Sequence, residues 1–457
     1  MNDGKDALIS LAMGLSLLLS ATFICYVTFL VVPFLRLRPT PPGDADDFRW
    51  HFFIPCRDEE AVIGQTVAYL RAHFPGTHLW VVDDDSEDGT AAIVAAREAG
   101  DDHVHLVQRR RPQARTGKSD ALNAAYRALA GWLPADADAD RVVIGVFDAD
   151  GHPAPGALDV MAAGHLFGDK AIGAVQSEVR MGNRDEYRPV PDGGRLRNLF
   201  ARTLVRMQDL EFRTTISATQ LTRRFTRTVG MGGNGQYTRL SALRSLTEDG
   251  TGPWRGALLE DFELGLDLML AGWQTSYTTD TSVDQEGLWS FRRLIAQRTR
   301  WGQGTMQCTR YLGRVWRSSA LTHAGVMEIS YYLLQPWIQV VGSVIFPIPV
   351  IYFTLHSATR PGDGAFFASG GWGWFLLLTA LGVGQFALWG PLYRWKCERE
   401  AGFWRSLGWG LAYFVYIYIF YITSWRALGR LVTGRNQWAK TRRNAELRVS
   451  GPTAVEY

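Results

Sequence analysis

VVIGVFDADGHP, residues 142–153, is the stretch that decides the fold. Its first half is an unbroken apolar run, which predicts a parallel strand that is buried on both faces. Asp148 and Asp150 follow, two positions apart, so in extended geometry both side chains leave one face at the carboxyl end of the strand, where open α/β sheets bind ligands. Paired carboxylates suit Mg²⁺ or Mn²⁺, whose shell is completed by substrate phosphates. The simpler alternative is an exposed turn, in which Asp, Gly and Pro are common.

Strands and helices alternate before this stretch. Strands are predicted at His51–Pro55 and Leu79–Val82, and each is followed by a segment with helical spacing or helix-capping residues. The predicted helices include Ala91–Ala99 and Gly117–Leu129. Alternation at this interval favours an α/β fold with a parallel sheet.

Three adjacent carboxylates, Asp83, Asp84 and Asp85, end the second predicted strand. Neighbouring like charges repel one another, so we expect something to bind there. Asp88, a little further on, is interpreted as a helix cap. Lys118 opens the next helix; it is either solvated or the charge partner of a phosphate.

Composition limits the class of protein. A chain of 457 residues suggests about three domains. The net charge of +3 is too small to indicate a nucleic-acid partner. The four cysteines are far apart in the sequence, so we expect no disulfide framework and no zinc site; they are Cys25, Cys56, Cys308 and Cys397.

The first apolar segment, Ile9–Leu35, carries no charge over roughly 27 residues, enough for one tilted crossing of a bilayer. A cleaved signal peptide is the rival interpretation, but the segment is too long for one and lacks a clearly basic start. Arg36 and Arg38 follow it and place the next domain in the cytoplasm. Pro39–Asp47 is expected to be a short linker.

Further apolar segments follow residue 320. We expect spans within Ser330–Leu355, Trp372–Tyr393 and Trp409–Trp425, with an interfacial helix around Ala320–Leu334. Earlier, Leu196–Phe225 mixes apolar residues with arginine, which suits an amphipathic helix on the bilayer surface; a solvated basic face is an equal alternative.

The side of the membrane on which the chain ends is ambiguous. Three crossings after a cytoplasmic domain place the tail outside, yet Gly434–Arg443 is strongly basic, which favours the inside. Either the last apolar segment lies in the interface or one apolar region crosses twice. We expect an inside tail.

Several motifs, in order, carry a family resemblance. IPCRDEE, VVDDDSEDGT, GKSDALNAA, VFDADGHP and LEDFELGLDLMLAGW, between residues 54 and 273, resemble the nucleotide-sugar-binding half of the family 2 glycosyltransferases, which have the GT-A fold. QRTRW, Gln297–Trp301, resembles the QxxRW signature of membrane-embedded synthases of cellulose, chitin, hyaluronan and poly-N-acetylglucosamine. The resemblance covers about residues 50 to 305.

The resemblance implies roles for individual residues. Asp261 would be the general base, Asp148 and Asp150 the metal ligands, and Gln297 and Trp301 the acceptor side. The implied nucleotide-sugar contacts are Pro55, Glu59, Asp84, Lys118, Asp148 and Arg300. Glycosyl transfer needs a base for the acceptor hydroxyl and positive charge for the leaving diphosphate, so these residue types fit the chemistry.

Some positions depart from the family pattern or allow a plainer interpretation. Asp58 stands where asparagine is usual, Asp85 where glycine is usual, and Leu259 where threonine is usual. Asp261 could be part of a helix cap, and Trp301 could be a core residue or an interface anchor. The glycine-rich stretch 230–239, GMGGNGQYTR, resembles the acceptor-facing stretch of the family but could be a flexible loop.

Together these observations predict a GT-A-like (Rossmann-like) α/β domain in the cytoplasm, inserted between transmembrane helices of the cell membrane. The predicted boundaries are 1–38 for a transmembrane helix, 39–310 for the transferase domain, 311–434 for interfacial and transmembrane helices, and 435–457 for a basic tail.

The predicted activity is inverting, metal-dependent transfer from a nucleotide sugar, a UDP-sugar by preference, to a growing glycan, with processive export across the membrane. One alternative is a single transfer to a lipid acceptor. Another, of a different class, is a transporter or nucleotide-sensing protein with a degenerate transferase domain. Expected partners are the sugar donor, a glycan or lipid-linked acceptor and membrane lipid, with a homo-oligomer or an export partner left open.

Overall fold

A mixed eight-stranded sheet forms the centre of the part of the chain that the structure describes. The structure is a computed structural model, and it describes residues 2–247, 251–348, 351, 380–435 and 444. The strands are β1 (Arg49–Cys56), β2 (His78–Asp84), β3 (Val104–Arg109), β4 (Val142–Val146), β5 (His152–Pro153), β6 (Ile172–Met181), β7 (Gln236–Arg239) and β8 (Gln274–Gln285).

The strand order is β3-β2-β1-β4-β7-β6-β8-β5. The first four strands in this order are parallel, β7 runs antiparallel to both β4 and β6, β6 and β8 are parallel, and β5 is antiparallel to β8. The predicted parallel α/β sheet is therefore confirmed for its first half, and the second half is mixed.

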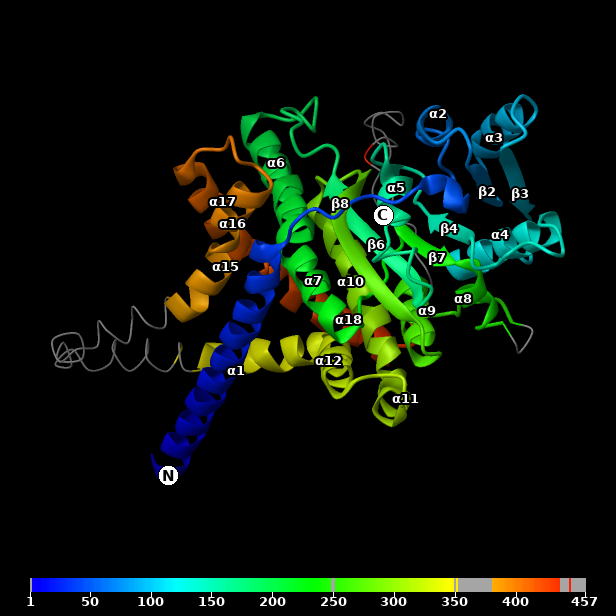
Figure 1. Cartoon of the computed structure of the whole chain (residues 1–457). Helices are drawn as coiled ribbons and strands as arrows, with labels where there is room; N and C mark the ends of the chain where they lie inside the picture. The colour runs from blue at the N-terminus through cyan, green and yellow to red at the C-terminus, as the bar shows by residue number, and fades with distance from the viewer. Residues whose placement is uncertain (1, 248–250, 349–350, 352–379, 436–443, 445–457) are drawn as a thin grey trace.

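Helices cover both faces of the sheet (Figure 1). In the first half of the chain they are α2 (Ile63–His73), α3 (Thr90–Glu98), α4 (Lys118–Trp132) and α5 (Ala157–Met161). Later come α6 (Arg195–Leu210), the π-helical turn η2 (Glu211–Ile216), α7 (Ser217–Thr226), α8 (Leu240–Arg244), α9 (Glu260–Leu270), α10 (Phe291–Cys308) and α11 (Leu312–Arg317). The predicted strands and helices around residues 51–132 all form at their expected places.

Alternating residues of β1 belong to different cores, as the period of two in a strand requires. Phe52 and Ile54 pack in a cluster with residues of α2, α3 and α5. Phe53 packs in a second cluster with residues of α4 and α9, which continues to α6, α7 and α10. The sheet is thus buried on both faces, which explains the unbroken apolar run of Val142–Val146.

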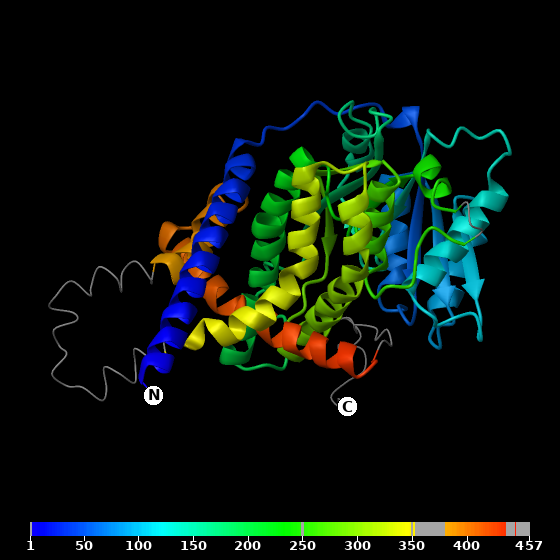
Figure 2. The same cartoon turned by 90° about the horizontal axis from the view of Figure 1, so that it is seen from below.

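The remaining helices lie along one side of the transferase-like domain (Figure 2). They are α1 (Asn2–Arg36), α12 (His323–Ile345), α15 (Gln385–Ala387), α16 (Trp389–Lys396), α17 (Phe403–Tyr416) and α18 (Tyr418–Val432). α18 packs against α10 and α12, and α1 packs against α7 and α12. Val27, Leu30 and Phe34 of α1 belong to the same apolar cluster as α4 and α9.

The described residues include one stretch, Phe403–Val432, that is long and apolar enough to cross a bilayer. It contains the predicted span Trp409–Trp425. The apolar part of α1, Ser20–Arg36, is shorter, so a crossing by Ile9–Leu35 stays a prediction. Three parts of the predicted segments lie outside the described residues: residues 372–379 of Trp372–Tyr393, the end of Ser330–Leu355 and most of the basic segment Gly434–Arg443.

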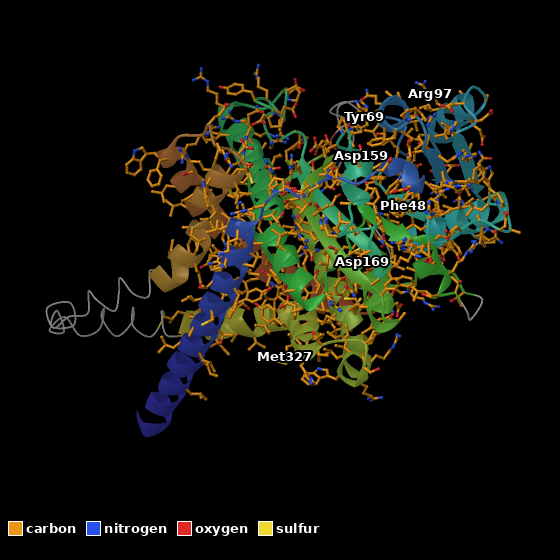
Figure 3. All side chains as sticks on the ribbon, in the orientation of Figure 1. Phe48, Tyr69, Arg97, Asp159, Asp169 and Met327 are labelled. Carbon is orange, nitrogen blue, oxygen red and sulfur yellow. The ribbon has the colours of Figure 1, made fainter. Side chains whose placement is uncertain are left out.

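α12 differs from the expectation of an interfacial helix followed by a separate span. It runs without interruption from His323 to Ile345 and contains Pro336. Its outer side is apolar: Met327 is 61% exposed (Figure 3), and Leu334, Ile338, Val341 and Val344 are also exposed.

The predicted linker is bound along the domain rather than loose, and it passes from α1 to the sheet in Figure 2. The backbone N–H and the hydroxyl of Thr40 donate to Oδ2 of Asp280 at 3.0 and 2.6 Å. Gly43 donates to the carbonyl oxygen of Asp159 at 2.8 Å, and a Cβ at Gly43 would lie 2.3 Å from the carbonyl oxygen of Ala162. Close backbone approach thus requires glycine there.

The basic segment predicted at Leu196–Phe225 is helical, as α6, η2 and α7. Its arginines, however, are only partly surface residues, because Arg206, Arg213 and Arg223 are buried in ion pairs. The buried arginines argue against a wholly solvated basic face. Leu196, Phe200 and Phe225 are exposed, so contact of this segment with a bilayer surface stays a prediction.

Candidate functional site

The carboxyl ends of β1, β2 and β4 meet at one edge of the sheet, because these strands are parallel neighbours. Asp148 and Asp150 lie just beyond β4 at this edge. Asp150 is only 7% exposed, and its Oδ2 accepts a hydrogen bond from the backbone N–H of Glu286 at 3.0 Å. Pro55 on β1, Glu59 beyond β1 and Asp84 on β2 belong to the same edge, as the sequence predicts.

Lys118 joins this edge to α9. Its ammonium donates to Oδ1 of Asp148 at 2.8 Å and to the carbonyl oxygen of Gly233 at 3.0 Å, and it lies 3.7 Å from Oε1 of Glu260. Burial lowers the pKa of the ammonium, but Asp148 and Glu260 outweigh burial, so the pKa of Lys118 is raised overall. The lysine is therefore a fixed positive charge inside the site and not a solvated side chain.

Asp261 sits in the first turn of α9, beside Lys118. Burial, together with the charge of neighbouring Glu260, raises the pKa of Asp261 to about 7; Lys118 and Arg300 act in the opposite direction. Its Oδ1 accepts from the backbone N–H of Phe262 at 2.7 Å. A carboxylate with a pKa near neutrality is suited to act as a general base.

The glycine-rich stretch 230–239 forms the wall between these groups. A Cβ at Gly233 would lie 2.8 Å from Nζ of Lys118 and 3.0 Å from Oδ2 of Asp261, so a larger residue there would have to displace the ammonium, the carboxylate or both. Next to it, Oδ1 of Asn234 accepts from the backbone N–H of Asp148 at 3.4 Å, and its Nδ2 donates to Gln285 at 3.0 Å. The sequence indicated that the glycine-rich stretch belongs to the site, but it did not assign a role to Gly233, Asn234 or Glu260.

The acidic end of β2 is neutralised by the chain itself. The loop RRRPQAR, residues 109–115, supplies one arginine to each carboxylate: Arg110 lies 2.8 Å from Asp83, Arg109 pairs with Asp84, and Arg111 lies 2.8 Å from Asp85. The backbone N–H of Arg115 also donates to both oxygens of Asp84 at 3.1 Å. The repulsion among the three acids therefore does not require an external ligand.

Asp58 and Asp85, which depart from the family pattern at this edge of the sheet, share one backbone conformation. Asp58 has φ of 53° and Asp85 has φ of 61°, both in the left-handed region. Asparagine, aspartate and glycine tolerate this region best among the residues. Aspartate at these positions therefore preserves the local backbone where asparagine and glycine are usual.

α10 carries the QRTRW segment, in which Arg300 interacts electrostatically with Asp261. Gln297 and Trp301 are half-buried and lie one turn apart. Arg300 is near enough to Asp261 to affect its pKa, and its buried Nε has no hydrogen-bond partner among the described residues. Arg298, which the sequence did not single out, places its guanidinium carbon 4.1 Å from the centre of the Trp301 ring.

The donor set fits a divalent cation only in part. Asp148 and Asp150 offer hard carboxylate oxygens at one strand end, but no group of three or more His, Cys, Asp or Glu side chains within the described ranges could hold a metal ion. A Mg²⁺ or Mn²⁺ ion bound by two carboxylates normally completes its shell with phosphate oxygens and water. The residues therefore fit a cation that arrives with a nucleotide diphosphate.

Comparison with known proteins places this geometry in a family. The family described as "Glycosyltransferase like family 2" matches residues 49–304, and "Glycosyl transferase family group 2" matches residues 197–428. The chain belongs to the family 2 glycosyltransferases. The first match covers every residue of the site described above, so this glycosyltransferase has its sheet edge, Lys118, Asp261 and QRTRW within the family region.

Curated relatives of the glycosyltransferase include the β-monoglucosyldiacylglycerol synthase of Synechocystis sp., 29% identical over 287 residues, which are 61% of this chain and 52% of the relative. The probable glycosyltransferase YdaM of Bacillus subtilis is 35% identical over 133 residues, which are 28% of this chain and 29% of the relative. The glycosyltransferase chain thus spans about half the length of the first of these relatives.

The fold of the glycosyltransferase is shared with a solved mannosyltransferase from Pyrobaculum calidifontis, with a TM-score of 0.50 and 17% identity over 89% of this chain and 97% of that one. That structure was solved in complex with GDP-mannose and Mn²⁺. At this identity the likeness establishes the GT-A-like fold of the described residues.

Proposed function

We propose that this glycosyltransferase is membrane-bound and transfers a sugar, with inversion, from a nucleotide sugar to a hydroxyl group of a membrane lipid. The observation that carries the proposal is the arrangement around Gly233, where Nζ of Lys118, which is paired with Asp148, and Oδ2 of Asp261 would lie 2.8 and 3.0 Å from the same Cβ position. The cation that would face the diphosphate and the carboxylate that would act as the base therefore lie beside one another.

The donor would lie along the sheet edge. Pro55, Glu59 and Asp84 would border the nucleoside, and Lys118 and Arg300 would face the diphosphate. Asp148 and Asp150 would hold Mg²⁺ or Mn²⁺, which neutralises the leaving diphosphate when bound. The buried Nε of Arg300, which has no partner among the described residues, supports an anionic ligand beside it.

Asp261 would take the proton of the acceptor hydroxyl. The acceptor oxygen then forms a bond to the anomeric carbon as the bond from that carbon to the diphosphate breaks, and the configuration inverts because one displacement occurs. The proton ends on Oδ of Asp261, whose raised pKa of about 7 makes it a competent acceptor near neutral pH. Gln297 and Trp301 would border the acceptor.

A lipid acceptor is favoured by two observations. The curated relatives from Synechocystis and two other organisms are named as synthases of a glycolipid. In this chain, Phe403–Val432 is apolar enough to cross a bilayer and the outer side of α12 is exposed and apolar. An exposed apolar face of this kind marks a membrane or protein contact.

Extension of a glycan chain is the second candidate function, and the QRTRW segment favours it. A planar indole suits the apolar face of a sugar ring, and Trp301 is held in place by Arg298 and Phe212. In that case the donor side is unchanged and an oligomer or export partner carries the product.

The test uses the full chain in phosphatidylcholine vesicles that contain dioleoylglycerol. A panel of UDP- and GDP-sugars is supplied with Mg²⁺ or Mn²⁺, and nucleotide release and product length are measured. One glycolipid product supports the lipid acceptor, whereas a ladder of longer products supports the synthase. Absence of nucleotide release with every donor, or an Asp261→Asn variant as active as the wild type, would refute the proposal.

A further inference from the structure

We propose that Glu211 is a positioning residue for the acceptor side of the site, because it holds Arg298 against the indole of Trp301 and ties both to Tyr416 of α17. The inference rests on the proposed function, in which Trp301 borders the acceptor. It adds a link between that residue and the stretch of helix that is apolar enough to cross a bilayer.

The three polar groups meet at one carboxylate oxygen. Oε2 of Glu211 accepts from Nη2 of Arg298 at 2.8 Å and from the hydroxyl of Tyr416 at 2.7 Å. Each of these residues is at most 5% exposed. A buried carboxylate with a charged and a neutral donor is a strong, geometrically fixed contact, since charge-assisted hydrogen bonds are the stronger kind.

Arg298, held in this way, packs against the indole of Trp301. Its guanidinium carbon lies 4.1 Å from the centre of the Trp301 ring system, a stacked cation–π contact. Phe212 meets the same indole at an interplanar angle of 80° and a centroid distance of 6.2 Å. The indole is therefore held by Arg298 over its face and by Phe212 in an edge contact, while its side chain is only half-buried.

Residues of the π-helical turn η2 contact two different helices, α10 and α17. A π-turn is wider than an α-turn, and such turns are frequent at functional sites. Glu211 and Phe212, adjacent in sequence, both contact α10, while Thr215 in the same turn lies 2.9 Å from the hydroxyl of Tyr413 on α17. The turn thus bridges α10, which carries QRTRW, and α17.

Loss of the Glu211 carboxylate would leave the buried guanidinium of Arg298 without its counter-ion. Burial raises the pKa of Glu211, and Arg298 and Tyr416 counter the shift. Nε of Arg298 is already buried without a hydrogen-bond partner among the described residues. Without the carboxylate, the guanidinium would be a buried charge lacking its counter-ion, so it would move toward water and away from Trp301.

The attachment of η2 to the helices near the end of the chain does not depend on Glu211 alone, because α16, which packs against α17, is held to η2 by other contacts. A separate buried cluster, Asp209, Arg213, Tyr393 and Glu398, also joins α6 and η2 to α16. Among the described residues, no hydrogen bond or ion pair of this cluster reaches Trp301. Glu211 is therefore separable, by mutation, from the general attachment of these helices.

The experiment compares Glu211→Gln, Tyr416→Phe and a matched control, Tyr413→Phe, with the wild type, all as full chains in vesicles with dioleoylglycerol. Tyr413→Phe removes the contact between the hydroxyls of Tyr413 and Thr215, which joins the same two elements, but keeps the ring and leaves both hydrogen bonds of Glu211 in place. The Michaelis constant for dioleoylglycerol, the kcat, and nucleotide release without acceptor are measured for each.

Glu211→Gln is expected to raise the Michaelis constant for the acceptor about tenfold or more, the range of one charge-assisted hydrogen bond. Nucleotide release without acceptor should stay within about twofold of the wild type, because donor contacts are untouched. Tyr416→Phe should act in the same direction but less, and Tyr413→Phe should match the wild type.

A Glu211→Gln variant with the acceptor constant of the wild type, or one that loses transfer and acceptor-free release equally, overturns the inference. If a thermal melt shows that Glu211→Gln does not fold, the same measurements are made on Tyr416→Phe and on Glu211→Asp, which keeps the carboxylate. The inference is then supported if Tyr416→Phe raises the Michaelis constant for the acceptor and Glu211→Asp leaves it close to that of the wild type. A wild type that releases no nucleotide with any donor instead defeats the proposed function, and the inference with it.

Discussion

Lys118 donates a hydrogen bond to Asp148 across 2.8 Å, and this contact connects the start of α4 to the end of β4. The lysine side chain is 13% exposed and the aspartate 31%, so the pair is shielded but not closed off from solvent. The same ammonium lies 3.7 Å from Glu260, next to the proposed base. One cation therefore borders both a proposed metal ligand and the turn of α9 that carries the proposed base.

Replacing Lys118 with methionine, which keeps the length of the side chain but removes the charge, should weaken donor binding. Loss of one charge-assisted hydrogen bond corresponds to about 10- to 100-fold in the Michaelis constant for the nucleotide sugar. Steady-state kinetics with varied donor check this. Lys170→Met, at an exposed position, serves as the control and should match the wild type; equal donor constants in both variants would contradict the role of Lys118.

The activity should depend on the protonation of Asp261. A base must be ionised to accept a proton, so kcat/KM should rise with pH and level off above about 7, the pKa that burial and Glu260 give this carboxyl. Asp261→Asn should lower kcat by about 10²- to 10⁴-fold and remove this rise. A pH profile of both proteins is the measurement, and a flat profile for the wild type would count against Asp261 as the base.

The same pKa has an opposite consequence for stability. The pKa of Asp261 is higher in the folded chain than its usual 3.8, so the folded state holds this proton more tightly than the unfolded state does. The free energy of unfolding is therefore unaffected by the ionisation of this group below pH 3.8 and decreases as the pH rises from 3.8 toward 7. The free energy of unfolding of Asp261→Asn, relative to that of the wild type, should therefore be larger at pH 8 than at pH 4. Denaturant titrations of both proteins at the two pH values measure this difference.

A cluster of imidazole and indole rings at the opposite end of β1 and β2 should make the fold sensitive to acid. The rings of His51 and His78 stack at 5.5 Å, and Nδ1 of His51 accepts from the indole N–H of Trp80 at 3.2 Å. Burial, with the charges of His78, His105 and Arg49, lowers the pKa of His51 to about 3, and burial with neighbouring histidines lowers that of His78 to about 4.

Histidines that stay neutral in the fold protonate on unfolding, so stability is complete above about pH 6.5 and falls as pH drops toward the folded pKa values. For His51 alone the loss is about 2 kcal/mol by pH 5. His51→Phe should reduce the acid dependence of the unfolding midpoint, whereas His323→Gln, at an exposed position, should not. Identical acid dependence in the wild type and His51→Phe would show that the cluster does not control it.

The ion pair between Arg223 of α7 and Glu328 of α12 should stabilise the junction of these helices. Nε of Arg223 donates to Oε1 of Glu328 at 2.8 Å, with side chains 6% and 15% exposed. Glu328→Ala leaves the arginine buried without its partner, which costs about 3–5 kcal/mol. Asp138→Ala, in an exposed pair with Arg141, should cost at most about 1 kcal/mol.

Thermal and denaturant unfolding of the two variants in lipid measure this difference. The double variant Arg223→Met with Glu328→Ala should recover much of the loss, since it removes both buried charges. A Glu328→Ala protein as stable as Asp138→Ala would show that the pair does not behave as a buried ion pair.

The strands β1, β2 and β4 and the helices α2, α3 and α4 could be predicted from the sequence because each obeys a local rule, whereas β3 was not predicted. β4 shows the apolar run of a fully buried strand, and α4 begins at Lys118, one residue beyond a glycine. The meeting of Lys118, Asp148 and Asp261 was implied by the resemblance alone, because it depends on contacts between residues more than a hundred positions apart.

Other features could not be predicted, since no local pattern announces them. The pairing of Arg109, Arg110 and Arg111 with the acids of β2 depends on where a loop returns to the sheet. The role of Arg298 was hidden because an arginine in a basic helix usually faces water, and only the approach of Glu211 makes it a buried residue.

The attachment of α1 bears on how the enzyme can be produced. Val27, Leu30 and Phe34 share a core with the catalytic sheet, and the ring of Phe34 meets that of Trp389 at 6.4 Å. A fragment cut at residue 38 to yield a water-soluble catalytic unit would uncover that core and its partner helices. Shortened versions should therefore aggregate, and the donor chemistry is best studied on the uncut polypeptide in detergent or lipid.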